Sequence, residues 1–110
     1  MAEAKNGVEE ITGNNIEEKL GKPLVVLDFF AEWCMPCLMM APVVEELHDK
    51  LKGKVTFFKV NIDDHQDLAR KFKVASIPTL IIFSKGVEKE RIVGSIPADA
   101  IEDKITSFLS

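Results

Sequence analysis

The chain has 110 residues, of which 46% are hydrophobic and 29% are charged, and its formal net charge is −4 at pH 7. This length and composition fit one globular domain over residues 1–110, with a loosely ordered N-terminus over residues 1–7. The acidic excess argues against binding to nucleic acid or to an anionic membrane surface. No apolar run in the sequence reaches membrane-spanning length.

The first ten residues, MAEAKNGVEE, lack the basic end and the apolar stretch of a signal peptide. We therefore expect an unprocessed cytoplasmic protein. The cytoplasm is a reducing compartment, so a purely structural disulfide is not expected there.

Two elements are predicted before the first cysteine. Residues 12–20, TGNNIEEKL, are predicted to form a helix, because Thr12, Asn14 and Asn15 are capping residues and acidic side chains follow them. Residues 23–30, PLVVLDFF, form a nearly continuous apolar run, which is typical of a strand buried on both faces.

A long helix is predicted from about residue 34 to residue 52. Pro42 lies inside this helix, so we expect a kink there, and Gly53 marks its end. Its apolar stripe, spaced by three and four residues, comprises Met40, Val43, Val44, Leu47 and Leu51.

The second half of the chain begins with a buried strand over residues 55–62, VTFFKVNI, and a short helix over residues 63–72, DDHQDLARKF. Two further strands are predicted over residues 78–84 and 88–94. Gly86 lies in the short link between them, and it favours a hairpin turn.

A closing helix is predicted over residues 97–109, with Pro97 in its first turn. Its buried stripe comprises Ile101, Ile105, Phe108 and Leu109. The whole order, with its β-α-β crossover, predicts an α/β fold in which a central mixed β-sheet is flanked by helices on both faces.

The only two cysteines, Cys34 and Cys37, stand beside the only tryptophan, Trp33. Such a pair has three interpretations: half of a metal site, a structural disulfide or a redox-active pair. Cys34 begins the long helix, where free N–H groups and the helix dipole favour the thiolate and lower the thiol pKa. Cys37 lies one turn later, so we expect an exposed nucleophile at Cys34 and a more buried resolving thiol at Cys37. Pro36 suits this first turn and stiffens the loop.

A structural zinc site needs two ligands beyond the cysteine pair. The chain offers His48, His65 and carboxylates, and both histidines are far from the pair in sequence. We expect both histidines on solvated faces and no metal.

Asp28 is the one acid inside the apolar run VVLDFF. One interpretation is a structural core acid whose oxygen atoms are hydrogen-bonded. The other is a proton acceptor, because burial raises the pKa of a carboxyl group. A carboxylate of raised pKa near Cys37 takes and returns a proton around neutral pH.

Four separated motifs, VVLDFFAEWCMPCLMMAP, KVNIDD, IPTLIIF and IVG, resemble the signatures of the thioredoxin family. They occur in the family's order over about residues 8–109. A C-x-x-C pair near a β-α-β pattern also fits this family. The resemblance implies the thioredoxin fold, with Cys-Met-Pro-Cys as a variant of the active-site sequence.

The resemblance also implies roles for individual residues. Cys34 is the attacking cysteine and Cys37 the resolving one. Asp28 matches the buried acid under the pair, and Lys59 matches the lysine beside that acid. Pro42 matches the helix-kinking proline.

The resemblance further implies a substrate-binding surface. Pro78 matches a cis-proline that faces the active site, and Ile77 matches the residue whose backbone pairs with substrate. Trp33 and Gly94 match the same surface. Met35 and Pro36, which lie between the cysteines, complete the set of substrate-binding residues.

Three positions depart from the common family pattern: Met35 replaces a glycine, Leu38 a lysine and Phe30 a tryptophan. The loss of a cation at Leu38 removes some stabilisation of the thiolate. The two residues between the cysteines influence the reduction potential, so Met35 leaves the direction of electron flow open.

The resemblance implies a thiol–disulfide oxidoreductase that reduces other proteins' disulfides by reversible Cys34–Cys37 exchange. Its partners would be disulfide-containing substrates and a thioredoxin reductase as electron donor. No cofactor, nucleic acid or membrane is expected, and we expect a monomer. A disulfide oxidase or isomerase of higher potential and a non-catalytic binding module stay as alternatives. A glutaredoxin-like use of glutathione fits the dipeptide and Asp28 less well.

Overall fold

The computed structural model describes residues 7–12 and 15–109. Five strands form one sheet in the order β1-β3-β2-β4-β5. Their bounds are Glu9–Glu10 for β1, Leu24–Phe30 for β2, Thr56–Asn61 for β3, Thr79–Ser84 for β4 and Val87–Val93 for β5. Strands β1, β3 and β2 run parallel, whereas β4 and β5 are antiparallel to their neighbours, so the predicted mixed sheet is confirmed. The predicted loose N-terminus, apart from Gly7, lies outside the described residues.

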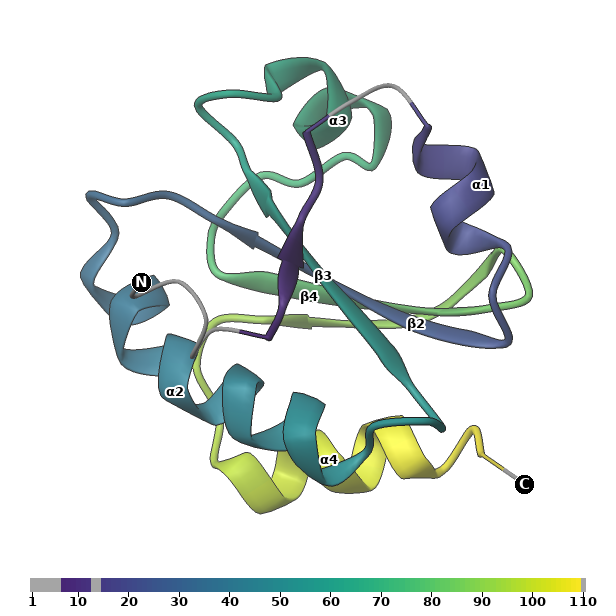
Figure 1. The fold of residues 1–110 in the computed structure, drawn as a ribbon. Coiled ribbons are helices and arrows are strands. Elements are labelled where there is room, and N and C mark those ends of the chain that lie inside the picture. The colour runs from purple at the N-terminus through teal and green to yellow at the C-terminus, as the bar shows by residue number, and fades with distance from the viewer. Residues whose placement is uncertain (1–6, 13–14, 110) are drawn as a thin grey trace.

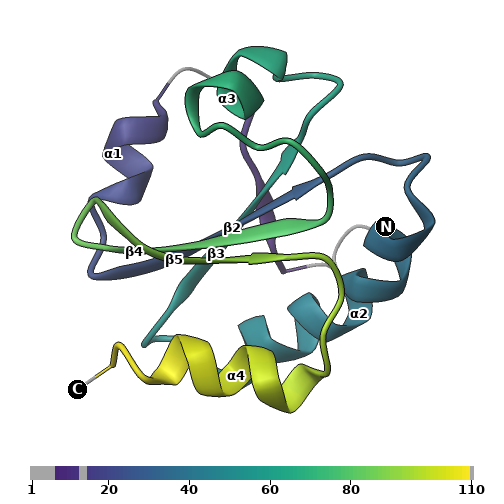
Figure 2. The same cartoon turned by 180° about the vertical axis from the view of Figure 1, so that it is seen from behind.

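Helices cover both faces of the sheet, as the sequence predicted (Figure 1). Their bounds are Ile16–Leu20 for α1, Met35–Lys50 for α2, Gln66–Lys71 for α3 and Ala98–Thr106 for α4. Helices α2 and α4 lie on one face, and α1 and α3 lie on the other (Figure 2). Within the described part of the chain, no helix is long and apolar enough to cross a membrane.

The first and last helices differ from the prediction at their starts. Helix α1 begins only at Ile16, with Asn15 as its N-cap and no capping hydrogen bond from that side chain. The predicted cap at Asn14 lies outside the described residues, and Thr12 precedes the helix. Pro97 is the N-cap of α4 rather than a first-turn residue, because its backbone is extended.

The long helix agrees with the prediction along most of its length. Four residues of the predicted stripe, Met40, Val44, Leu47 and Leu51, are buried, and Val43 packs against them partly exposed. Helix α2 continues on both sides of Pro42, and the kink expected at this proline stays a prediction. Gly53 follows the helix with a φ of 89°, a conformation that favours glycine.

The predicted hairpin joins β4 and β5. Two residues, Lys85 and Gly86, form its loop, and their φ angles are 53° and 86°. Two-residue hairpin loops favour positive φ at both positions, because the resulting twist matches that of the strands. Gly86 supplies one of them without strain.

Two apolar cores lie on the two faces of the sheet. The α1/α3 core comprises Ile11, Ile16, Leu20, Val25, Leu27, Phe29, Phe58, Val60, Leu68, Ile81 and Phe83. The α2/α4 core comprises Val8, Leu24, Val26, Met40, Val44, Leu47, Leu51, Val55, Phe57, Leu80, Ile82, Ile92, Ile101 and Ile105. Strand β2 contributes alternate side chains to each core, as the period of two in a strand requires.

Candidate active site

A disulfide joins Cys34 and Cys37 at the start of α2, with 5.2 Å between their Cα atoms. Strand β2 ends four residues before Cys34, so the pair lies where a buried strand passes into a helix. Cys34 is the N-cap of α2, and its Sγ accepts a hydrogen bond from the Cys37 backbone N–H at 3.2 Å. This sulfur occupies the position of a capping serine oxygen. The same N–H favours a thiolate at Cys34 when the pair is reduced.

The expected contrast in exposure between the two cysteines is not present in the disulfide form. Cys34 is 4% exposed and Cys37 is 5% exposed, so the prediction of an exposed Cys34 was wrong for this state. The reason is local packing, because both sulfurs join a small apolar cluster against Phe30, Ile62 and Ile77. The two cysteines still differ, since Cys34 lines the groove described next and Cys37 is not among its lining residues.

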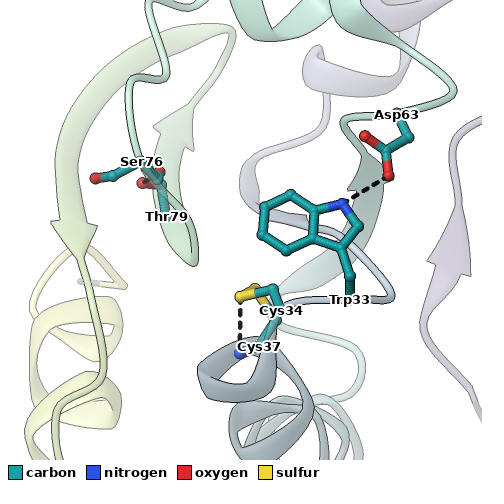
Figure 3. The surroundings of a disulfide bond; sticks show 6 residues. All are labelled: Trp33, Cys34, Cys37, Asp63, Ser76 and Thr79. Atoms are coloured by element: carbon teal, nitrogen blue, oxygen red, sulfur yellow. Dashed lines mark hydrogen bonds between the residues drawn. A yellow bond between two sulfur atoms is a disulfide. The ribbon is translucent and has the colours of Figure 1, made fainter.

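An apolar groove of about 430 Å³ opens beside the disulfide. It is lined by Trp33, Cys34, Met35, Pro36, Ile62, Val74, Ala75, Ser76 and Ile77. Figure 3 shows the disulfide between the Trp33 ring and the segment that carries Ser76 and Thr79. The structure therefore brings Trp33, Met35, Pro36 and Ile77 together around Cys34, as predicted.

Pro78 and Gly94 lie beside the groove rather than in its lining. The Ile77–Pro78 peptide bond is cis, which confirms the expectation from the family resemblance. Pro78 is buried, and its carbonyl oxygen accepts a hydrogen bond from the Gly94 N–H at 2.8 Å. Gly94 has a φ of 89°, so a side chain at this position would be strained.

The Trp33 indole is exposed but held in place. Its Nε1–H donates a hydrogen bond to the Asp63 carboxylate at 2.9 Å (Figure 3). The Asp63 N–H in turn donates to the side-chain oxygen of buried Asn61 at 2.9 Å. Asn61 is the last residue of β3, so the sheet holds the loop that carries Asp63. That loop in turn holds the indole.

Asp63, Asn61 and the wall of the groove formed by residues 74–76 were not predicted from the sequence. An Asn-x-Asp sequence after a strand is a signal for a turn in which the first side chain bonds the backbone two residues on. That signal was present in KVNIDD. The wall of the groove carries no comparable signal. Its loop is held by a hydrogen bond from the Thr79 hydroxyl to the Ser76 carbonyl oxygen at 2.7 Å.

Asp28 is buried, with 8% of its surface exposed. It lies on the α2/α4 face of β2, since Val26, two residues earlier on this strand, belongs to the α2/α4 core. Burial raises the pKa of Asp28 to about 7, and the positive charge of Lys59 opposes part of that rise. Lys59 is the residue of β3 that pairs with Asp28, and its Nζ lies 5.7 Å from the centre of the Phe30 ring. The predicted rise in pKa and the proximity of Lys59 are both found.

A small cavity of about 20 Å³ adjoins Asp28 and Lys59. Ala41, Val44 and Glu45 of α2 form part of its wall. A cavity of this size holds one water molecule when polar groups line it. Ala41 follows Cys37 by four residues, so the two lie on one face of α2. Asp28 thus faces the same side of α2 on which Cys37 lies.

The described residues contain no group of three or more His, Cys, Asp or Glu side chains close enough to hold a metal. The expectation that both histidines lie on solvated faces was wrong, because both are half-buried. The His48 ring lies edge-on to Phe57 with their centres 6.0 Å apart. His65 is the N-cap residue of α3.

The fold and the site together define a class: an α/β domain with a disulfide pair at a helix start, a buried acid on the adjoining strand and a cis-proline after a residue that lines the groove. Comparison with known proteins agrees with this class. Residues 7–107 match the family model described as thioredoxin. The chain belongs to the thioredoxin family.

The individual relatives described next are also thioredoxins. A thioredoxin from Chlamydia caviae is 44% identical over 94 residues, which cover 86% of this chain and 91% of that protein. A chloroplastic M-type thioredoxin from Brassica napus is 42% identical over 102 residues, which cover 93% of this chain but 57% of that protein. A solved thioredoxin mutant from Halobacterium salinarum has a TM-score of 0.86 and 31% identity, and the match covers 96% of this chain and 94% of that one.

The chain thus spans nearly the whole length of the bacterial relative and little more than half of the chloroplastic one. The family and the cysteine pair together support thiol–disulfide oxidoreductase chemistry for this domain.

Proposed function

We propose that this chain is a thiol–disulfide oxidoreductase that reduces disulfides in other proteins. One observation carries the proposal: a Cys34–Cys37 disulfide caps a helix start, and only its Cys34 end lines an apolar groove. An incoming disulfide reaches Cys34 through the groove, while Cys37 stays behind it. The site therefore has one attacking and one resolving sulfur.

The reaction starts from the reduced pair. The Cys34 thiolate attacks one sulfur of the substrate disulfide, and the other substrate sulfur leaves as a thiolate. Cys37 then loses its proton and attacks Sγ of Cys34, which breaks the mixed disulfide and releases the second substrate thiolate. Two electrons pass to the substrate, which takes up two protons, and the domain returns to the Cys34–Cys37 disulfide seen here.

Asp28 is proposed as the proton acceptor for Cys37. Its pKa of about 7 means that the carboxyl group is about half ionised near neutral pH, which suits reversible proton transfer. Lys59 keeps this pKa from rising further. A water molecule in the small cavity beside Asp28 is proposed to carry the proton, since the cavity lies on the face of α2 that holds Cys37.

The groove is proposed to bind the polypeptide on either side of the substrate cysteine. Trp33, Met35, Pro36 and Ile77 supply apolar contact around Cys34. The backbone near Ile77 is proposed to pair with the substrate backbone. Pro78 and Gly94, joined by their backbone hydrogen bond, shape the neighbouring surface and complete the substrate-binding residues.

The wider setting follows from this chemistry. We propose a single thioredoxin domain over residues 1–110 that acts as a monomeric electron carrier in cell redox homeostasis. A thioredoxin reductase would reduce the Cys34–Cys37 disulfide to the dithiol again. We propose a cytoplasmic location. Because one relative is chloroplastic, the chloroplast is the second compartment to test. Fractionation of the source cells followed by detection of the protein would decide between them.

The proposal is tested by reduction of insulin, a protein with exposed disulfides, with a dithiol as the electron source. We expect the wild-type protein to accelerate the reduction and Cys34→Ser to abolish the acceleration. Cys37→Ser should accumulate a mixed disulfide with the substrate, visible on a non-reducing gel. Full acceleration by Cys34→Ser would overturn the enzyme proposal and favour a binding module.

The reduction potential of the pair separates a reductase from an oxidase of the same fold. A value near the −270 mV or so of a reducing thioredoxin supports the proposal, whereas one near about −120 mV identifies an oxidant. Equilibration with glutathione buffers of known ratio measures it. The test is needed because Met35 lies between the cysteines and Leu38 carries no charge near them.

A further inference from the structure

The methionines of α2 occupy three different environments. Met35 is 64% exposed, Met39 is 72% exposed and Met40 is 4% exposed. Met40 packs in the α2/α4 core. The chain's remaining methionine, Met1, lies outside the described residues. One short helical segment therefore presents two accessible thioethers and one protected thioether.

The two exposed methionines differ in what they adjoin. Met35 lies between the cysteines and lines the groove with Trp33 and Ile77. Met39 lies one helical turn further on and is not among the groove's lining residues. Among the described residues, those that line the groove are all uncharged. A change in polarity at Met35 would thus alter the contacts of anything bound in the groove. The same change at Met39 would leave those contacts unchanged.

Oxidation makes that change. A methionine thioether gives two electrons to hydrogen peroxide: a sulfur–oxygen bond forms, the O–O bond breaks, and water leaves with the other oxygen atom. The product, a sulfoxide, is polar where the thioether was soft and apolar. In the disulfide form both cysteines are already paired, so neither offers a thiolate to the peroxide.

We propose that Met35 is a peroxide-sensitive modification site that regulates the groove. Its oxidation to the sulfoxide weakens docking of apolar substrate segments beside Cys34, while the disulfide protects the cysteines. This inference rests on the proposed function for its effect on catalysis. The modification itself, and its effect on the Trp33 environment, do not depend on that function.

The test starts from the disulfide form of the wild-type protein, Met35→Leu and Met39→Leu. Each protein is treated with hydrogen peroxide, and the peroxide is then removed. Tandem mass spectrometry locates added oxygen, and a thiol count after reduction checks that both cysteines survive. Insulin reduction is then measured, and each treated protein is compared with its own untreated rate. Incubation with methionine sulfoxide reductases tests whether the loss is reversed.

We expect oxygen on Met35 and Met39 but not on Met40 in the wild-type protein. The rate should fall by roughly three- to tenfold in treated wild type and Met39→Leu, because a polar group in an apolar contact is unfavourable. Treated Met35→Leu should keep its own untreated rate. An equal fall in all three proteins, or Met35 left unoxidised beside oxidised Met39, would overturn the inference.

Trp33 emission separates failure of this inference from failure of the proposed function. It is the only tryptophan and shares the groove with Met35. In the disulfide form, peroxide should change its emission in wild type and Met39→Leu but not in Met35→Leu. If no protein reduces insulin before treatment, the proposed function fails, and this pattern of emission still decides whether Met35 is the site. An unchanged spectrum in oxidised wild type would contradict the inference.

Discussion

The two faces of strand β2 differ sharply although they are built from alternate residues of one run. Toward α1 and α3, Val25, Leu27 and Phe29 are completely buried among other apolar side chains. Toward α2 and α4, the strand buries Val26 and then Asp28, whose pKa is raised by that burial. The cysteine pair lies at the start of α2, the helix that covers the second face together with α4 (Figure 1).

This difference indicates that the two faces of the sheet have different roles. The α1/α3 core consists of apolar side chains and contributes mainly to stability, and the groove residues Ile62 and Ile77 pack against its edge. The α2/α4 face accepts a buried carboxyl group, which is unfavourable when ionised, and this group faces the helix that the disulfide begins. We therefore expect substitutions on the first face to change stability, and substitutions on the second to change chemistry.

The largest effect is expected at Cys34. Cys34→Ser removes the nucleophile and should reduce disulfide-exchange activity to background. The serine oxygen keeps an acceptor at the N-cap of α2, so the free energy of unfolding should stay within about 1 kcal/mol of reduced wild type. Urea unfolding checks this stability alongside the activity assay. A mutant that loses activity only because it unfolds would break the proposed division between the faces.

The matched change on the other face is Leu27→Ala. Leu27 is completely buried beside Asp28 in sequence but on the opposite face. The mutant should lose about 2–5 kcal/mol of unfolding free energy, since it leaves a cavity in the α1/α3 core. The activity per folded molecule should be nearly unchanged. A strong loss of turnover in the folded mutant would show that the two faces are coupled.

Asp28→Asn should make the protein more stable and slower. The pKa of Asp28 is about 7 in the folded state and 3.8 in its ordinary state, so between these values the folded protein holds the extra proton. Stability from this site is complete below pH 3.8 and is lost as pH rises through 7. At pH 8 the substitution should therefore stabilise the protein by about 4 kcal/mol, since each pKa unit corresponds to about 1.4 kcal/mol, and the gain should nearly vanish near pH 4.

Urea unfolding of wild type and Asp28→Asn across this pH range measures the gain. Turnover should fall as well, because Cys37 loses its proton acceptor, and mixed disulfide should accumulate. A gain in stability that does not vary with pH would show that Asp28 is not ionised at neutral pH. Unchanged turnover would leave Asp28 as an ordinary core acid.

The smallest effect on stability is expected at Asp63, which acts on the groove from the loop after β3. Asp63→Ala should free the Trp33 indole, lower its fluorescence anisotropy and change the free energy of unfolding by about 1 kcal/mol or less. Asp64→Ala is the control, since it removes an equal charge from the same loop and leaves the indole hydrogen bond in place. Equal anisotropy in the two mutants would mean that the hydrogen bond does not position Trp33.

Trp33 emission should also report the redox state, because the ring lies beside the disulfide (Figure 3) and a disulfide quenches a neighbouring indole. Reduction of Cys34–Cys37 should therefore raise the emission. The measurement has one source, since Trp33 is the only tryptophan. Identical spectra of oxidised and reduced protein would contradict the placement of the indole against the sulfurs.

Much of the fold followed from local pattern. Continuous apolar runs predicted β2 and β3, and the Gly86 link predicted the β4–β5 hairpin. The burial of Asp28 followed from its place inside an apolar run, and its raised pKa followed from burial. These inferences succeeded because each depends on neighbours in sequence.

The missed features depend on contacts between distant segments. Asp63 bonds Trp33 across 30 residues of sequence, and no local pattern pairs them. The burial of Cys34 depends on Ile62 and Ile77 from other parts of the chain. His48 is half-buried because Phe57 of the neighbouring strand lies against it. Tertiary packing decided each case, and the sequence carries that information only through the fold.

The central claim is that the α2/α4 face carries a carboxyl group whose raised pKa suits proton transfer. Titration of the Asp28 carboxyl carbon by NMR in the disulfide form tests it most directly. We expect a midpoint near pH 7, as burial dictates, and a higher midpoint in Lys59→Met, which removes the opposing charge. A midpoint near pH 4 in the wild-type protein would contradict the account.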